Sequence, residues 1–318
     1  MFKNIQVLSI ARNWVVDPQA IEVALDGARF VECGASQESS SGWIEPRGEA
    51  HGPLLENVGG QLIIRLKTET KTVPGAVITR RAKERAEQIE ASTGRKPGKK
   101  EISEIKEDIK QELLLVAFAK QSTTLVWIDP VANRLVIDAA SSAKVDEVVT
   151  LLVKSIEGLA LTFIETRVSP TVAMSEWLTT QEPPVGFTVD RECELKAADE
   201  SNATIKFGKS QLDTEEVKNY VESGKLPVKL ALTWDGRVSF VLTDKGTIKK
   251  LDFLDVVFER QSAVEKDSGF DADVAMATGE LRKLIPDLID ALGGEADVKA
   301  DAIPEGGTAD AVVALATA

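Results

Sequence analysis

A narrow apolar stripe inside a highly charged segment is the feature that most constrains the fold of this chain. Its members recur at steps of three and four, as on one face of a helix: Ile102, Ile105, Ile109, Leu113 and Ala117. The spacing predicts a helix over about residues 100–120, preceded by a polar helix over residues 75–93, with Gly94 and Pro97 between them. Because so narrow a stripe leaves each helix only its partner to pack on, residues 75–120 are predicted to form a hairpin that projects from the body.

The turn of this hairpin, residues 94–100 (GRKPGKK), places four cations at the tip: Arg95, Lys96, Lys99 and Lys100. The whole chain carries a net charge of −13, which repels a polyanion, so binding to DNA requires segregated positive charge. Residues 65–120 hold 14 Lys and Arg against 9 Asp and Glu. Two charged helices of mixed sign are also typical of an ordinary solvated surface, and charge alone therefore leaves DNA binding and a bland exposed hairpin both open.

The rest of the chain predicts an α+β fold of two sandwich-like domains with antiparallel sheets. The first domain covers residues 1–165 and carries the hairpin, and the second covers residues 166–294. Residues 228–243 alternate around the Asp235-Gly236 turn signal, which predicts a β-hairpin. Residues 295–318 are acidic and rich in Ala, which is typical of a disordered tail.

Local signals add further expectations. A strand is expected at residues 28–32, and an irregular connection at residues 34–60 in which Trp43, Leu54 and Leu55 hold the chain to the body. Ser142 is expected to cap a helix over residues 143–157, and Thr278 to cap the final helix.

Most enzymatic chemistries find no support in the sequence. His51 is the single histidine and lies among Gly and Pro, no phosphate-binding loop is present, and Cys33 and Cys193 are too isolated for a zinc site. Asp271 and Asp273 leave one alternative open, a metal-dependent nuclease. No metal, other cofactor or catalytic residue is expected. The sequence has no run of about 20 apolar residues. We therefore expect a soluble, cytoplasmic protein that does not enter membranes.

Five segments, in order, resemble one known family. They are FVECGASQ with Gly42-Trp43, GGQLIIRLKTETKTVP, AFAKQSTTLVWID, KLALTWDGRVSF and FDADVAMATGELRKLIPDLIDALGGEA, which together reach from residue 30 to residue 296. This order and length resemble the RdgC family of recombination-associated proteins.

The resemblance implies a non-enzymatic, nucleoid-associated protein whose homodimer forms a ring around DNA. It implies binding to double and single strands without sequence preference, and a limit on RecA access or strand exchange. Phe118 matches an apolar dimer contact. Basic positions of the family match Lys71, Arg95, Lys96, Lys99, Lys120 and Lys209, although Ser210 stands where an amide side chain is expected. Besides the nuclease, one further alternative to the DNA-binding ring remains. In it the helical hairpin docks a protein partner, with RecA a candidate.

Overall fold

A computed structural model describes residues 2–199, 203–259 and 269–296. The strands are β1 (Ile5–Ile10), β2 (Ser39–Ile44), β3 (Glu56–Val58), β4 (Gln61–Lys71), β5 (Ala119–Asp129), β6 (Arg134–Asp138), β7 (Leu161–Phe163), β8 (Phe187–Ala197), β9 (Thr204–Gly208), β10 (Lys225–Trp234), β11 (Val238–Thr243) and β12 (Ile248–Phe253). The helices are α1 (Pro18–Asp26), α2 (Gly75–Thr93), α3 (Lys99–Leu114), α4 (Ser142–Ser155), α5 (Pro170–Thr180), α6 (Glu215–Glu222), α7 (Asp255–Glu259) and α8 (Phe270–Ala291). The predicted α+β class is confirmed.

All the described strands belong to one antiparallel sheet, with the order β2-β4-β5-β6-β1-β12-β11-β10-β8-β9. Strand β3 pairs with β4, and β7 pairs with β1. The two halves of the chain join where β1 meets β12, at the pair Ile5 and Ile248. The predicted domain boundary at residues 165 and 166 lies in the segment between β7 and α5, and the division into two domains stays a prediction.

The period of two along the strands divides the apolar residues between two cores. In β4, Leu62 and Ile64 face a core that α1 and α4 cover, whereas Ile63 faces a second core shared with the C-terminal half. Helix α8 closes this second core, and an ion pair between side chains connects it to the N-terminal half. Arg282 Nε lies 2.9 Å from Asp129 Oδ2, an acceptor that is almost fully buried.

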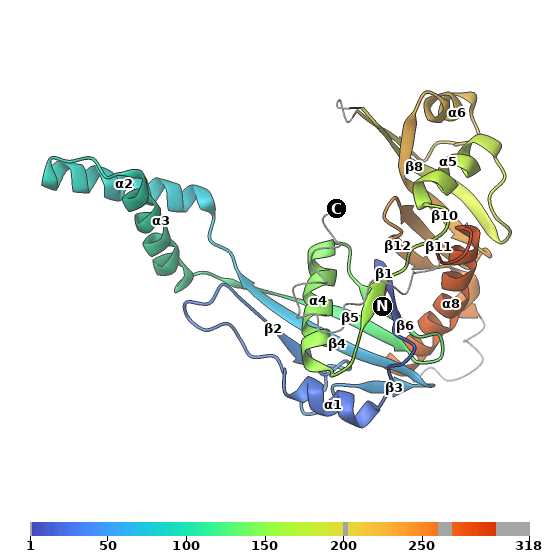
Figure 1. Ribbon diagram of the computed structural model, residues 1–318, viewed down its shortest axis with the longest axis horizontal. Coiled ribbons are helices and arrows are strands. Elements are labelled where there is room, and N and C mark those ends of the chain that lie inside the picture. Colours follow the sequence, from blue (N-terminus) through green and yellow to red (C-terminus); the bar gives the residue numbers. More distant parts are fainter. Residues whose placement is uncertain (1, 200–202, 260–268, 297–318) are drawn as a thin grey trace.

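The outline is a crescent (Figure 1). Helices α2 and α3 form one arm, which projects from the ends of β4 and β5, and strands β8 and β9 with α6 form the other. Within the first arm, Ala82 packs against Ile105 and Ile109 in a small core separate from the other two. The projecting hairpin is therefore confirmed, and its first helix has the predicted bounds.

The second hairpin helix ends earlier than its apolar stripe predicts. Helix α3 stops at Leu114, and β5 already begins at Ala119, so Ala117 and Lys120 are not helical. The reason is tertiary: residues 119–128 pair along the whole length of β4, from Lys71 with Ala119 to Leu62 with Ile128. Pairing with β4 replaces a last helical turn that would have only the α2 helix as a neighbour.

The segment between α1 and β4 also differs from expectation. Residues 28–32 form no strand, only a bridge between Arg29 and Trp43, while β2 and β3 lie within the region predicted as irregular. The expected anchors Trp43, Leu54 and Leu55 are buried, as predicted. Gly42 allows the close approach of the two segments, because a Cβ at this position would stand 2.4 Å from the Cα of Phe30.

Two predicted helix caps are wrong. Ser141, one residue before the expected Ser142, is the N-cap of α4, and its side chain makes no capping hydrogen bond. Thr278 lies buried inside α8, where its hydroxyl donates to the carbonyl of Val274 at 2.8 Å. The N-cap of α8 is Gly269, which makes no side-chain capping hydrogen bond.

Cys193 is buried, and burial raises the pKa of its thiol to about 12, whereas Cys33 is only half-buried. The described helices include none with the length and apolar character needed to span a membrane. In the predicted tail, Glu295 pairs with Arg134 and the Ala296 N–H donates to the Glu165 carbonyl. Residues 297–318 of that tail lie outside the described residues.

Candidate nucleic-acid interface

The tip of the helical hairpin gathers the four cations that the sequence places there. Gly94 ends α2 with a φ of +67°, which turns the chain so that Lys99 and Lys100 open α3 beside Arg95 and Lys96. All four side chains are exposed. Arg95 forms an ion pair with Glu101 at 2.9 Å, and Lys100 lies 4.0 Å from Glu104, whereas no described carboxylate pairs with Lys96 or Lys99.

Along the hairpin shaft, by contrast, the positive charges are largely balanced. Arg80 with Glu84 and Lys83 with Glu87 form loose pairs one helical turn apart, at 3.9 and 3.8 Å. Arg85 reaches across to Glu112 on α3 at 3.0 Å. Because exposed pairs of this kind contribute little to stability, their main effect is to neutralise the shaft and leave the tip as the cationic end of the arm.

Lys71 and Lys120 lie side by side at the base of the hairpin. They occupy neighbouring strands, where Lys71 pairs with Ala119 and Thr70 pairs with Lys120. Lys120 is exposed, but the Lys71 ammonium donates to the carbonyls of Gly34 and Ala35 at 2.8 and 3.2 Å. Lys71 therefore holds a loop in place, and Lys120 is the freer of the two predicted DNA contacts.

Phe118 stands just before β5 and is 95% exposed. Leu115 and Val116, in the same short link between α3 and β5, are exposed as well. A run of large apolar side chains open to water costs free energy, and a monomer gains nothing from it. The arrangement suits the predicted contact with a second subunit.

Lys209 lies far from the hairpin, directly after β9 on the other arm of the crescent (Figure 1). Its side chain is exposed, and its backbone has a φ of +57°, a left-handed conformation that is uncommon for a lysine. The structure thus divides the predicted cations into three places: the hairpin tip, the hairpin base and the end of β9.

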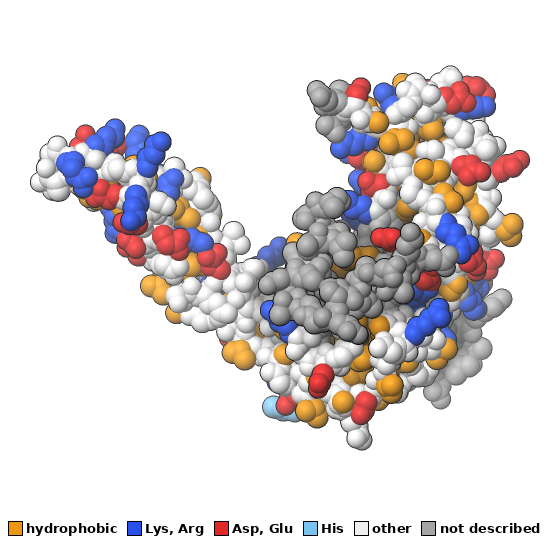
Figure 2. Space-filling model, in the orientation of Figure 1, with side chains coloured by type: hydrophobic (Ala, Val, Ile, Leu, Met, Phe, Trp, Pro, Cys, Tyr) orange, Lys and Arg blue, Asp and Glu red, His pale blue; other side chains and the backbone are white. Residues whose placement is uncertain are grey.

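The space-filling view shows Lys and Arg gathered over the hairpin and also along the β8 side of the hollow (Figure 2). A further excess of positive charge along the chain escaped the sequence reasoning. Residues 225–250 hold 6 Lys and Arg against 2 Asp and Glu, a denser excess than in the hairpin. A charge count over this window would have found it, although its β-hairpin pattern drew attention to the strands alone.

The carboxylates of the nuclease alternative lie in a different setting. Asp271 and Asp273 are in the first turn of α8, and Asp271 forms an ion pair with Arg47 at 2.5 Å. Arg47 also lies 2.9 Å from Glu56. Within residues 2–199, 203–259 and 269–296, no group of three or more His, Cys, Asp and Glu side chains is placed to hold a metal ion.

Comparison with known proteins gives a consistent result. Residues 1–295 match the family described as "Putative exonuclease, RdgC". A "Recombination-associated protein RdgC" from Dechloromonas aromatica is 42% identical over 299 residues, which cover 92% of this chain and 98% of that protein. Proteins of the same name from Herminiimonas arsenicoxydans and Bordetella pertussis are 40% and 42% identical, each over 92% of this chain and 98% of the relative.

Proposed function

Because the chain belongs to the RdgC family of recombination-associated proteins, we propose that it binds DNA through the phosphate backbone and encircles the duplex as a homodimeric ring. Binding through phosphates carries no base sequence information, so double and single strands are both ligands. By occupying DNA in this way the protein limits RecA access or strand exchange.

The observation that carries this proposal is the crescent itself. A helical arm with a cationic tip stands across an open hollow from a second arm that ends near Lys209 (Figures 1 and 2). Two crescents related by a two-fold axis meet through identical surfaces, and contacts at both ends close a ring. The exposed Phe118 at the base of the hairpin supplies an apolar surface for a contact between the two subunits.

A closed ring also accounts for the charge distribution. The chain has a net charge of −13, so a surface with the average charge of the chain repels DNA. Salt at physiological concentration screens charges beyond roughly 8 Å, so the DNA responds mainly to the cations nearest to it. Cations that line the hollow then suffice for binding, although the chain as a whole is acidic.

Topological capture gives the direct test. We expect the protein to remain on closed circular DNA when salt is raised to about 1 M, where phosphate contacts are screened within roughly 3 Å, and to leave after the circle is cut at one site. Sedimentation of fluorescent circles before and after cutting measures the difference. Equal retention on circular and linear DNA contradicts the ring, although binding through phosphates would stand.

A metal-dependent exonuclease is the second candidate, favoured by the description of the family whose model matches. We propose instead that the protein has no enzymatic activity, because Arg47 forms an ion pair with Oδ1 of Asp271, one of the two carboxylates that the nuclease alternative requires. With magnesium or manganese and end-labelled duplex, we expect no shortening of the DNA. Shortening that the Asp271→Asn variant abolishes would establish the nuclease and refute the proposal.

A further inference from the structure

A second lysine-rich surface lies at the junction of the two halves of the chain. An open cavity of about 530 Å³ is bounded by the start of α4, by β7 and by strands β10, β11 and β12. Three lysines line it: Lys229, Lys245 and Lys249. Ser141, Ser142, Thr243 and Thr247 also line it. No site predicted from the sequence includes any of these residues.

Two of these lysines are available to a ligand. Lys229 is already committed, because its ammonium lies 2.8 Å from Glu194. Among the described residues, none forms an ion pair or a side-chain hydrogen bond with Lys245 or Lys249. Asp244 is the single carboxylate among the described residues that line the cavity, so the lining keeps an excess of positive charge.

Helix α4 adds to this positive field. Its N-cap Ser141 makes no capping hydrogen bond through its side chain, and its first turn contains no acidic residue. The first backbone N–H groups of a helix lack acceptors within the helix, and the peptide dipoles give this end a partial positive charge. The helix end and the lysines come from segments about 100 residues apart and meet at the same cavity.

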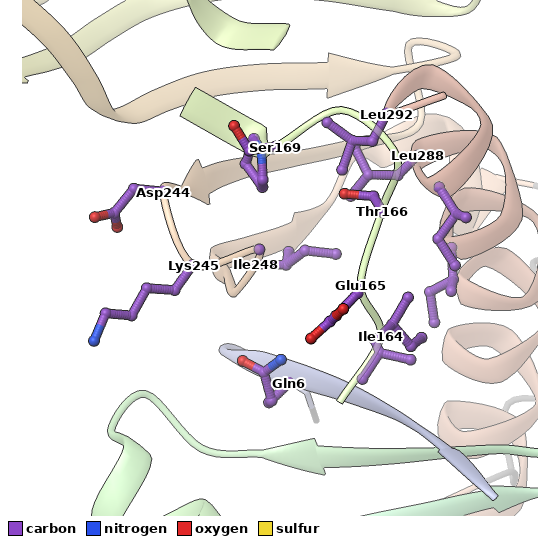
Figure 3. Close-up of a pocket in the computed structure, with 15 residues that line it drawn as sticks. Gln6, Ile164, Glu165, Thr166, Ser169, Asp244, Lys245, Ile248, Leu288 and Leu292 are labelled. Atoms are coloured by element: carbon purple, nitrogen blue, oxygen red, sulfur yellow. The ribbon is translucent and has the colours of Figure 1, made fainter. Parts of the chain in front are cut away.

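The location suits a ligand held in the hollow of the crescent. Figure 1 places α4 between the helical arm and the strands of the C-terminal half. An adjacent cavity of about 340 Å³ shares Gln6, Ile164, Asp244 and Lys245 with the lysine-lined one, and Figure 3 shows its apolar side against α8. Lys245 extends away from α8 in that view.

We propose that the lysine-lined cavity binds a phosphate group of the DNA backbone, held by Lys245, Lys249 and the first turn of α4. The inference rests on the proposed DNA binding and adds a contact zone separate from the hairpin tip. A phosphodiester matches the site because it offers charged oxygen acceptors both to ammonium groups and to backbone N–H groups.

A pair of cap substitutions separates binding from folding. Asp and Asn are both good N-caps, so Ser141→Asp and Ser141→Asn should each preserve α4 and the melting temperature. The aspartate adds a negative charge at the cavity, and we expect it to weaken binding to a duplex of about 30 base pairs roughly tenfold near 0.1 M salt. The neutral asparagine should bind like the unmodified chain. Equal affinity of the two variants overturns the inference.

The lysines provide an independent measurement. For Lys245→Ala with Lys249→Ala, the slope of log affinity against log salt should fall by about 0.9, because one phosphate is no longer neutralised. Lys154→Ala with Lys283→Ala removes the same charge from exposed positions in the last turn of α4 and on α8, and should leave the slope unchanged.

The possible failures are distinguishable. If the unmodified chain binds DNA and both lysine pairs give the same slope, the cavity does not hold a phosphate, while the proposed function stands. If the unmodified chain does not bind DNA at all, the proposed function fails and this inference fails with it.

Discussion

Alanine at all four tip positions, Arg95, Lys96, Lys99 and Lys100, is expected to weaken DNA binding about 100-fold and to lower the salt slope by roughly 3. Each cation that neutralises a phosphate releases a counterion, and the tip holds the largest group of exposed cations on the helical arm. Titration of labelled duplex at several salt concentrations measures both quantities.

The fold should survive these four changes. The side chains are exposed, and the hairpin is held by the packing of Ala82 against Ile105 and Ile109, away from the tip. The ion pair between Arg95 and Glu101 lies at the surface, where such pairs contribute about 0–1 kcal/mol. Melting temperatures should therefore be nearly equal.

An exchange of Arg and Lys at the same four positions is the matched control. It keeps the charge at each position, so phosphate binding without base readout should persist. If the alanine variant instead keeps both its affinity and its salt slope, the tip does not touch phosphates. The hairpin would then be better explained as a docking module for a protein partner, with RecA the first to test.

Phe118→Ser is expected to raise the dissociation constant of the proposed homodimer by about 30-fold or more, the effect of losing an interface residue that contributes roughly 2 kcal/mol. Because Phe118 is 95% exposed in the single chain, its loss should leave the folding of each subunit unchanged. Sedimentation over a dilution series should show monomers at concentrations where the unmodified chain is dimeric. Retention on circular DNA at high salt should fall as well.

Val185→Ser gives the control, since Val185 is 100% exposed but lies in the loop before β8, away from the hairpin. Removing it should change neither dimerisation nor melting. A Phe118→Ser variant that dimerises as strongly as the Val185→Ser variant would show that Phe118 is not an interface residue. The ring would then need a different contact surface.

Local signals in the sequence predicted the hairpin well. Residues 75–93 form α2 as expected, and the Gly94 turn brings Arg95, Lys96, Lys99 and Lys100 together. These features depend on near neighbours, because a glycine with positive φ and the spacing of Ile105 and Ile109 act within a few turns of chain. The β-hairpin at Asp235-Gly236 was predictable for the same reason.

Contacts between distant segments decided where α3 ends, how the two halves join and which cations lie together. Pairing of β5 with β4 ended α3 at Leu114 and left Phe118 exposed outside a helix. The β1–β12 pairing joined the two halves and set the start of α4 beside Lys245 and Lys249, about 100 residues further along the chain. By itself the sequence determined the composition of each charged segment and its local conformation. Which cations share a surface was decided only by the tertiary structure, because strand pairing joins residues without regard to their separation in the chain.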